Sequence, residues 1–194
     1  MARDASNPGD GTGSIPSVPF FFLRHGETDW NRRGVLQGAI DIPLNETGLA
    51  QAHAAAARFS GVAIATVVAS PLSRARVTAE IAAAALGLPV EFEPAIAEVS
   101  WGNREGTPDG DTIDRWLDGD TPEGGEPVAS FNARVAAGMT RALSRPGPVL
   151  VVAHGGVFRA VRTLLSLPPA ARVENARPLF LSPDAGGWKI ADVA

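Results

Sequence analysis

Three short apolar runs along the chain are each followed by polar and glycine-rich residues. The runs cover residues 18–23, 65–69 and 148–153. Continuous apolar runs of this length are typical of strands that are buried on both faces, as in a parallel sheet. A shorter strand is predicted at residues 90–92, and edge strands at 179–181 and 188–190.

Segments with helical periodicity lie between these strands. They predict helices over residues 45–59, 72–86, 111–118, 130–144 and 155–167. Asn45 is a typical N-cap, and we expect Ser70 to be the N-cap and Pro71 the first-turn proline of the second helix. Gly87 is expected to end that helix. Strands that alternate with helices predict an α/β fold, a three-layer α/β/α sandwich with a mainly parallel central sheet.

The ends of the domain follow from composition. Residues 1–17 are rich in Gly, Ser, Pro and Asn and offer almost nothing to bury, so a disordered N-terminal tail is predicted there. The length of 194 residues then suits one domain over residues 18–194. Within it, residues 94–127 are rich in loops and are predicted to form a cap-like insertion, with one long loop also expected at residues 28–43.

Composition excludes several classes of partner. The net charge of −4 argues against a nucleic-acid partner and against an anionic membrane surface, since both require a basic face. The chain has no cysteine, hence no disulfide and no thiolate metal site. No apolar run reaches the 18 or so residues that span a bilayer, and the N-terminus does not resemble a signal peptide. We therefore expect a soluble, cytoplasmic protein.

Residues suited to binding an anion follow each of the three buried strands. The first strand ends in Arg24 and His25, the second leads to Arg74 in the first turn of a helix, and the third ends in His154 and Gly155. Parallel strands present their carboxyl ends, where ligands bind, at one edge of the sheet. Guanidinium groups match phosphate oxygens, and the free amides at the helix start beside Gly155 favour an anion. The sequence therefore predicts a phosphate pocket.

Three motifs resemble those of a known family. RHGETDWN at residues 24–31, SPLSRA at 70–75 and HGG at 154–156 are similar to the signatures of the histidine phosphatase superfamily, also called the phosphoglycerate mutase-like family. The resemblance extends over about residues 20–190, and it implies a phosphoglycerate mutase-like fold. The third histidine of the chain, His53, lies outside these motifs in mid-helix, where a solvent-exposed or packing position is expected.

The resemblance also implies a role for each catalytic residue. His25 is the expected nucleophile, which becomes phosphohistidine. Arg24, Arg74 and His154 are expected to surround the phosphate and stabilise the transferring group. Glu98 is the expected proton donor to the leaving oxygen, and it later takes a proton from the attacking water. A carboxylic acid at this position typically contributes about 10²–10⁴-fold to the rate.

Other assignments complete the expected site. The resemblance implies that Asn31 adds a hydrogen bond to the phosphate and that Thr28, Gln37 and Gly38 line the pocket. Glu27 and Glu105 remain alternatives to Glu98 for the acid.

No metal and no cofactor are expected, because arginines take the place of a cation at the phosphate. Asp109, Asp111 and Asp114 could indicate a divalent-cation site, but helix capping and solvation account for them. There is no Walker A sequence and no GxGxxG after a strand, which argues against a nucleotide-binding Rossmann domain.

The family contains both mutases and phosphatases, and this sequence favours a phosphatase. Residues 99–127 lack the Arg-Arg pair typical of the mutases, Glu98 is followed by Val-Ser-Trp rather than Arg-His-Tyr, and His154 begins HGG rather than His-Gly-Asn. The short cap, with Trp101, Trp116 and Phe131 nearby, suits a small phosphate monoester with a less charged leaving group. A cofactor-dependent phosphoglycerate mutase and a phosphate-binding module without catalysis remain alternatives, and a homodimer stays open.

Overall fold

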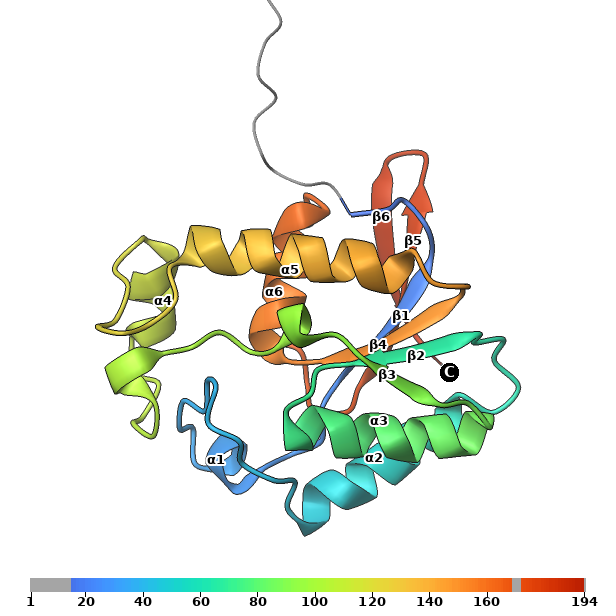
Figure 1. Ribbon diagram of the computed structural model, residues 1–194, viewed down its shortest axis with the longest axis horizontal. Helices are drawn as coiled ribbons and strands as arrows, with labels where there is room; N and C mark the ends of the chain where they lie inside the picture. The colour runs from blue at the N-terminus through green and yellow to red at the C-terminus, as the bar shows by residue number, and fades with distance from the viewer. Residues whose placement is uncertain (1–14, 169–171, 194) are drawn as a thin grey trace, which may run out of the picture.

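The computed structural model describes residues 15–168 and 172–193 (Figure 1). Most of the tail predicted over residues 1–17 lies outside the described residues. Ile15, within that predicted tail, is 5% exposed and packs into the larger of two core clusters. Core packing thus begins upstream of residue 18, although the sequence predicted that the domain starts at residue 18.

A six-stranded mixed sheet forms the centre of the molecule. Its strands are β1 (Phe20–Arg24), β2 (Thr66–Ala69), β3 (Val90–Phe92), β4 (Val149–Ala153), β5 (Pro178–Asp184) and β6 (Gly187–Asp192). Their order across the sheet is β3-β2-β4-β1-β5-β6. The first four are mutually parallel, whereas β5 runs antiparallel to β1 and β6 antiparallel to β5. The predicted strands and the mainly parallel sheet are confirmed. However, β5, expected at an edge of the sheet, pairs with β1 on one side and with β6 on the other.

Helices cover both faces of this sheet, as Figure 1 shows. They are α1 (Asp29–Arg32), α2 (Glu46–Arg58), α3 (Ser73–Leu86), α4 (Thr112–Leu117), α5 (Val128–Leu143) and α6 (Gly155–Leu164), with short 3₁₀ helices at Pro94–Ile96 and Gly102–Arg104. Phe20 and Phe22 share a core with α5 and α6, while Phe21 and Leu23 share the other core with α2 and α3. Because alternate residues of β1 enter opposite cores, the whole strand is buried.

Two predicted helix caps are confirmed and one is wrong. The Asn45 Oδ1 atom accepts a hydrogen bond from the Gly48 amide at 2.8 Å, and Gly87 ends α3 in the left-handed conformation with φ of 68°. Ser70, however, is not the N-cap of α3. The helix begins at Ser73, and its first amide donates to the Asp41 carboxylate at 2.7 Å. Asp41 therefore caps this helix from a distant loop.

The predicted cap insertion, residues 94–127, lies between β3 and α5, with α4 at the left of Figure 1. Trp116 joins it to the body of the protein, because its ring packs edge-on against Trp101 at 5.2 Å and against Phe131 of α5 at 5.7 Å. Within the part of the chain that the structure describes, no helix is both long enough and apolar enough to cross a membrane.

Candidate active site

His25 follows directly after β1 and is 2% exposed. Its amide donates to the Ala153 carbonyl at 2.9 Å, which holds it beside the end of β4. The ring Nδ1 atom lies 2.7 Å from the Gly26 carbonyl, and because a carbonyl only accepts, this nitrogen carries the proton. Burial, followed by the positive charges of Arg74 and Arg24, holds the pKa of His25 well below its usual value. The imidazole is therefore neutral, with its lone pair on Nε2.

His154 faces His25 across the site, with 5.2 Å between the ring centroids. Its Nε2 atom lies 2.7 Å from the Ser70 hydroxyl oxygen, which explains the position of this serine better than a helix cap does. The Nδ1 atom is buried and has no hydrogen-bond partner among the described residues. Burial and the charge of Arg74 keep the pKa of His154 well below its usual value. This second imidazole is also neutral.

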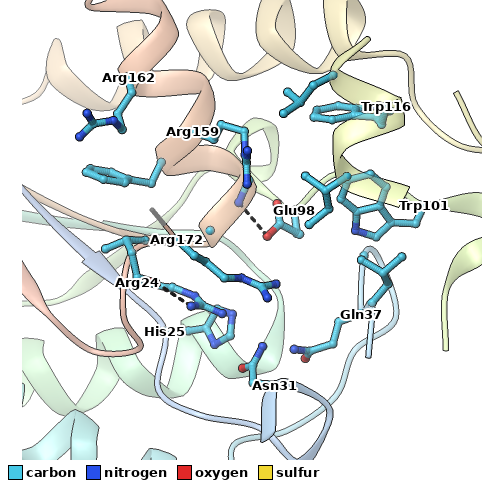
Figure 2. Close-up of a pocket in the computed structure, with 18 of the residues that line it drawn as sticks. Arg24, His25, Asn31, Gln37, Glu98, Trp101, Trp116, Arg159, Arg162 and Arg172 are labelled. Atoms are coloured by element: carbon cyan, nitrogen blue, oxygen red, sulfur yellow. Dashed lines mark hydrogen bonds between the residues drawn. The ribbon is translucent and has the colours of Figure 1, made fainter. Parts of the chain in front are cut away.

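Arg24 ends β1 and is 5% exposed. One of its terminal nitrogens donates to the Val173 carbonyl at 2.7 Å, as the dashed line in Figure 2 marks. Burial is the main cause that lowers its pKa to about 10, and the positive charge of Arg172 is the next. Arg24 thus remains charged at neutral pH and is held rigidly next to His25.

Arg74 lies in the first turn of α3 and is 1% exposed. Its terminal nitrogens donate to the Ile40 carbonyl at 2.9 Å and to the Gly38 carbonyl at 2.8 Å. Burial lowers its pKa as well. Arg74 therefore fixes the loop that carries Gln37 and Gly38 while it contributes positive charge to both histidines.

Glu98 enters the site from the cap, opposite the start of α6. One carboxylate oxygen accepts from the Gly156 amide at 3.1 Å and the other from the Val99 amide at 3.0 Å. A Cβ atom at Gly156 would lie 2.2 Å from the Glu98 carboxylate, so a larger residue there would require the Glu98 side chain to move. Arg134 of α5 donates to the carbonyls of Ala95 and Ala97 and so fastens the segment that precedes Glu98.

The two alternative acids have other partners. Glu27 accepts from the Asn45 side chain at 2.9 Å. Glu105 accepts from the Ala39 amide at 2.9 Å and from the Trp101 amide at 3.1 Å, which ties the cap to the loop around Gly38. Of the three glutamates, all within the described residues, Glu98 is the one that lines the cavity.

A cavity of about 210 Å³ opens in front of His25 (Figure 2). It is lined by Arg24, Arg74 and Glu98 and by four of the predicted substrate-binding residues, namely Asn31, Gln37, Gly38 and Gly155. Thr28 does not line it. Its hydroxyl accepts from the Asn31 amide at 3.1 Å and caps α1, so it positions Asn31 rather than touching a ligand.

His154 stands behind this lining rather than in it, fully buried against His25. Asn175 lies on the segment before β5. Its side-chain nitrogen donates to the His25 carbonyl at 2.9 Å and to the Asn31 side chain at 3.2 Å. It therefore supports the loop that carries both residues.

Three further arginines line the cavity that the sequence did not assign to the site: Arg159 and Arg162 on α6, and Arg172 on the segment before β5. Two of them could have been found from helical spacing. Residues 155, 159 and 162 follow one another at intervals of four and three, so they share the face of α6 that begins at the phosphate site. For Arg172 the sequence offers no comparable signal.

The described residues contain no cluster of three histidine, aspartate or glutamate side chains that could hold a metal ion. Asp111 precedes α4 without a side-chain capping bond, so its predicted capping role is not seen. His53 is exposed on α2, as expected.

Known proteins with similar sequences fall into one family. The model of the histidine phosphatase superfamily (branch 1) matches residues 20–194. The "Uncharacterized phosphatase PhoE" of Bacillus subtilis is 36% identical over 147 residues, covering 74% of this chain and 75% of that protein. The "Probable phosphoglycerate mutase GpmB" of Yersinia enterocolitica is 35% identical over 164 residues, covering 78% of this chain and 76% of that protein.

Solved structures agree with these relatives. A mycobacterial glucosyl-3-phosphoglycerate phosphatase, solved with VO3, has a TM-score of 0.80 at 27% identity and covers 91% of this chain and 100% of its own. A putative α-ribazole-5'-P phosphatase of Escherichia coli has a TM-score of 0.77 at 25% identity and covers 92% and 96%. The fold, the order of the motifs and these matches lead to one conclusion: the chain belongs to the histidine phosphatase superfamily.

Proposed function

We propose that this protein is a phosphatase that hydrolyses small phosphate monoesters through a phosphohistidine intermediate on His25. The observation that carries this proposal is the protonation state of the His25 ring and its position at the cavity. Its proton is fixed on Nδ1 by the Gly26 carbonyl, and its Nε2 atom carries the lone pair at a cavity that Arg24 and Arg74 also line. A neutral imidazole nitrogen is a competent nucleophile, and covalent catalysis divides one hard step into two easier ones.

In the first step, the His25 Nε2 atom attacks phosphorus. The N–P bond forms while the bond from phosphorus to the leaving oxygen breaks, and protonated Glu98 gives its proton to that oxygen. Arg24 and Arg74 hold the negative charge of the transferring phosphoryl group, where positioning and electrostatics supply most of the rate.

In the second step, water attacks the phosphohistidine. Glu98, now a carboxylate, takes one proton from that water while the new P–O bond forms and the N–P bond breaks. Inorganic phosphate leaves, and both His25 and Glu98 return to their starting states. The two backbone amides that bind Glu98 keep its carboxyl group in one place through both steps.

The cap supports hydrolysis over mutase chemistry. Its arginines are engaged within the cap itself, since Arg104 donates to Thr112 at 3.2 Å and Arg115 pairs with Asp120. Neither lines the cavity. The volume of about 210 Å³ suits a small ester, because a cavity of about 150 Å³ already accommodates a benzene ring.

A panel of phosphate monoesters tests the proposal, with 4-nitrophenyl phosphate as the generic substrate. The wild-type protein should hydrolyse it, and His25→Ala should reduce turnover to background without loss of fold by circular dichroism. The matched control is His53→Ala, which removes an exposed histidine of α2 and should keep full activity. EDTA should not inhibit.

Three outcomes would contradict parts of the proposal. Turnover that persists in His25→Ala would exclude His25 as nucleophile, and a requirement for metal would exclude the mechanism. Interconversion of 2- and 3-phosphoglycerate after phosphorylation by 2,3-bisphosphoglycerate, faster than hydrolysis, would identify a mutase instead.

A further inference from the structure

The loop that follows β1 and carries the nucleophile is held from behind by side chains that the proposed chemical steps do not use. The Gly26 amide donates to the Thr78 hydroxyl of α3 at 3.1 Å. The next amide, of Glu27, donates to the Oε1 atom of Gln51 on α2 at 2.9 Å. Gln51 lines a separate groove and not the cavity at His25, so it does not touch a substrate bound there. Any influence of Gln51 on the reaction must therefore pass through the loop.

Two glycines bring α2 close enough for this contact. A Cβ atom at Gly26 would lie 2.3 Å from the Gly48 carbonyl oxygen, and one at Gly48 would lie 2.0 Å from the Glu27 carbonyl oxygen. Because these neighbours are backbone atoms, which cannot swing aside as a flexible side chain can, the helix and the loop leave no room for side chains between them. Gln51 lies three residues after Gly48, on the same face of α2, and it therefore reaches the loop.

One peptide group connects Gln51 to the nucleophile. The Gly26 carbonyl accepts from the His25 Nδ1 atom at 2.7 Å, and the amide of the same peptide is the Glu27 N–H that donates to Gln51. The peptide is conjugated, so a hydrogen bond at its N–H increases the negative charge on its carbonyl oxygen. Gln51, the peptide and the His25 ring thus form a continuous chain of hydrogen bonds, and the attacking Nε2 atom lies at the far side of the ring.

This chain acts most strongly while the N–P bond forms. In the resting protein the Gly26 carbonyl keeps the proton of His25 on Nδ1, and a displaced peptide would let the proton occupy Nε2, where it blocks attack. As Nε2 bonds to phosphorus, the imidazole gains positive charge and its Nδ1–H becomes a stronger donor. A fixed and polarised carbonyl therefore stabilises the transition state more than the resting ring, which is the condition for a faster reaction.

We propose that Gln51 is a positioning residue for the nucleophile. Through the peptide between Gly26 and Glu27 it fixes the tautomer of His25 and polarises the carbonyl that accepts from Nδ1. This proposal rests on the phosphatase activity proposed above and deepens it. It assigns to one peptide and a neutral side chain the part that a carboxylate plays behind the histidine of a Ser-His-Asp triad.

The kinetics of the first chemical step test this role. Gln51→Leu removes the acceptor at similar size, and it should slow the pre-steady-state release of 4-nitrophenolate from 4-nitrophenyl phosphate about 10-fold, the effect of one neutral hydrogen bond. Inhibition by inorganic phosphate should be unchanged, because Arg24 and Arg74 keep their own partners. Gln51→Glu retains an acceptor oxygen and should restore most of the rate.

NMR of isotope-labelled histidine gives a readout that a merely structural role would not change. The chain has three histidines, so His25→Ala identifies the signals of His25. In the wild-type protein Nδ1 should be the protonated nitrogen, with its proton resonance far downfield. Gln51→Leu should move this resonance upfield and bring the shifts of the two ring nitrogens closer together. Gln51→Glu, with a stronger acceptor, should move the proton resonance further downfield.

Thr78→Val is the matched control. It removes the acceptor of the Gly26 amide, which belongs to the neighbouring peptide and is not part of the chain to Nδ1. Both Thr78→Val and Gln51→Leu lose a hydrogen bond to the loop and should lose stability in urea denaturation. Thr78→Val, however, should leave the His25 resonances in place.

Different failures separate the two proposals. If Gln51→Leu and Thr78→Val shift the His25 resonances alike, or if neither Gln51 variant shifts them, Gln51 is only a structural residue and the phosphatase stands. If Gln51→Leu does not fold, Gln51→Glu decides by the presence or absence of the downfield shift. If His25→Ala keeps its turnover, the phosphatase mechanism fails, and Gln51 has no nucleophile to position even where the resonances shift.

Discussion

At the scale of single residues, the sequence identified the groups that carry charge but not the contacts of all of them. Arg24, His25, Arg74 and His154 were found because each follows a buried strand. Ser70 was interpreted as a helix cap, yet its hydroxyl contacts His154. The contact between Ser70 and His154 depends on the pairing of β2 with β4. In this pairing Ala69 lies opposite Val152, which brings the ends of the two strands level. Local sequence does not contain this register.

The assignment of Glu98 as the catalytic acid, rather than Glu27 or Glu105, leads to a prediction at the scale of single residues. Glu98→Gln keeps an oxygen for the Gly156 amide but cannot donate the catalytic proton. We expect kcat to fall by about 10²–10⁴-fold for an alkyl phosphate, and far less for 4-nitrophenyl phosphate, whose leaving group needs no acid. Steady-state kinetics with both substrates measure this difference.

Glu105→Gln is the matched control for the acid, because its amide oxygen can still accept from Ala39 and Trp101. It should change kcat by less than about threefold on either substrate, the range of a modest change in one neutral contact. A larger loss in Glu105→Gln than in Glu98→Gln would reverse the assignment.

At the scale of elements, the long periodic helices and the short helix α4 were predicted closely, whereas the helix α1 was not. The loop expected over residues 28–43 contains the four-residue helix α1, which is too short to show a period. It exists because Thr28 and Asn31 form a reciprocal capping box. Likewise, the sequence shows that Arg159 and Arg162 share a face of α6. It does not show that this face closes a cavity, because the opposite wall comes from the irregular cap.

The cap at the start of α3 leads to a prediction about both the stability of the protein and the binding of substrate. Asp41 accepts from both the amide and the hydroxyl of Ser73 at 2.7 Å, next to Arg74. Asp41→Ala should lower the free energy of unfolding by about 0.5–2 kcal/mol, as other lost caps do. Because the same loop carries Gln37 and Gly38, KM should rise more than kcat falls.

Urea denaturation and steady-state kinetics test this, with Asn45→Ala as control. That variant removes the cap of α2 and should cost similar stability, with KM unchanged. If the two variants raise KM equally, the effect is a general loss of stability, and Asp41 has no special role in positioning Arg74.

At the scale of the whole molecule, the fold concentrates charge that the composition conceals. The chain has a net charge of −4, yet five arginines from four separate segments meet in one cavity. Parallel pairing of β1, β2 and β4 brings three of the segments to one edge, and the segment after α6 adds the last arginine. The residues at the strand ends predicted that the first three segments meet at one edge of the sheet. The position of the segment after α6 depends on chain packing, which has no local signature in the sequence.

The same concentration of charge keeps two buried histidines neutral, with consequences for stability. Both His25 and His154 have pKa values held well below the usual 6.5 by burial and by neighbouring arginines. As the pH falls below 6.5, the unfolded chain gains protons on these residues while the folded protein does not. Their contribution to stability is therefore complete above about pH 6.5 and is lost progressively as the pH falls towards the folded-state values.

The resulting slope can be measured by urea denaturation between pH 7.5 and 5.0, in buffers without phosphate, since a bound anion would stabilise the folded state. The free energy of unfolding should fall by up to about 1.4 kcal/mol per pH unit for each histidine. His25→Asn should remove about half of this slope, whereas His53→Asn, on the exposed face of α2, should leave it intact. A wild-type free energy that stays level from pH 6.5 to 5.0 would mean that the two imidazoles take up protons in the folded protein. A protonated His25 could not be the nucleophile, so this measurement of stability also tests the catalytic proposal.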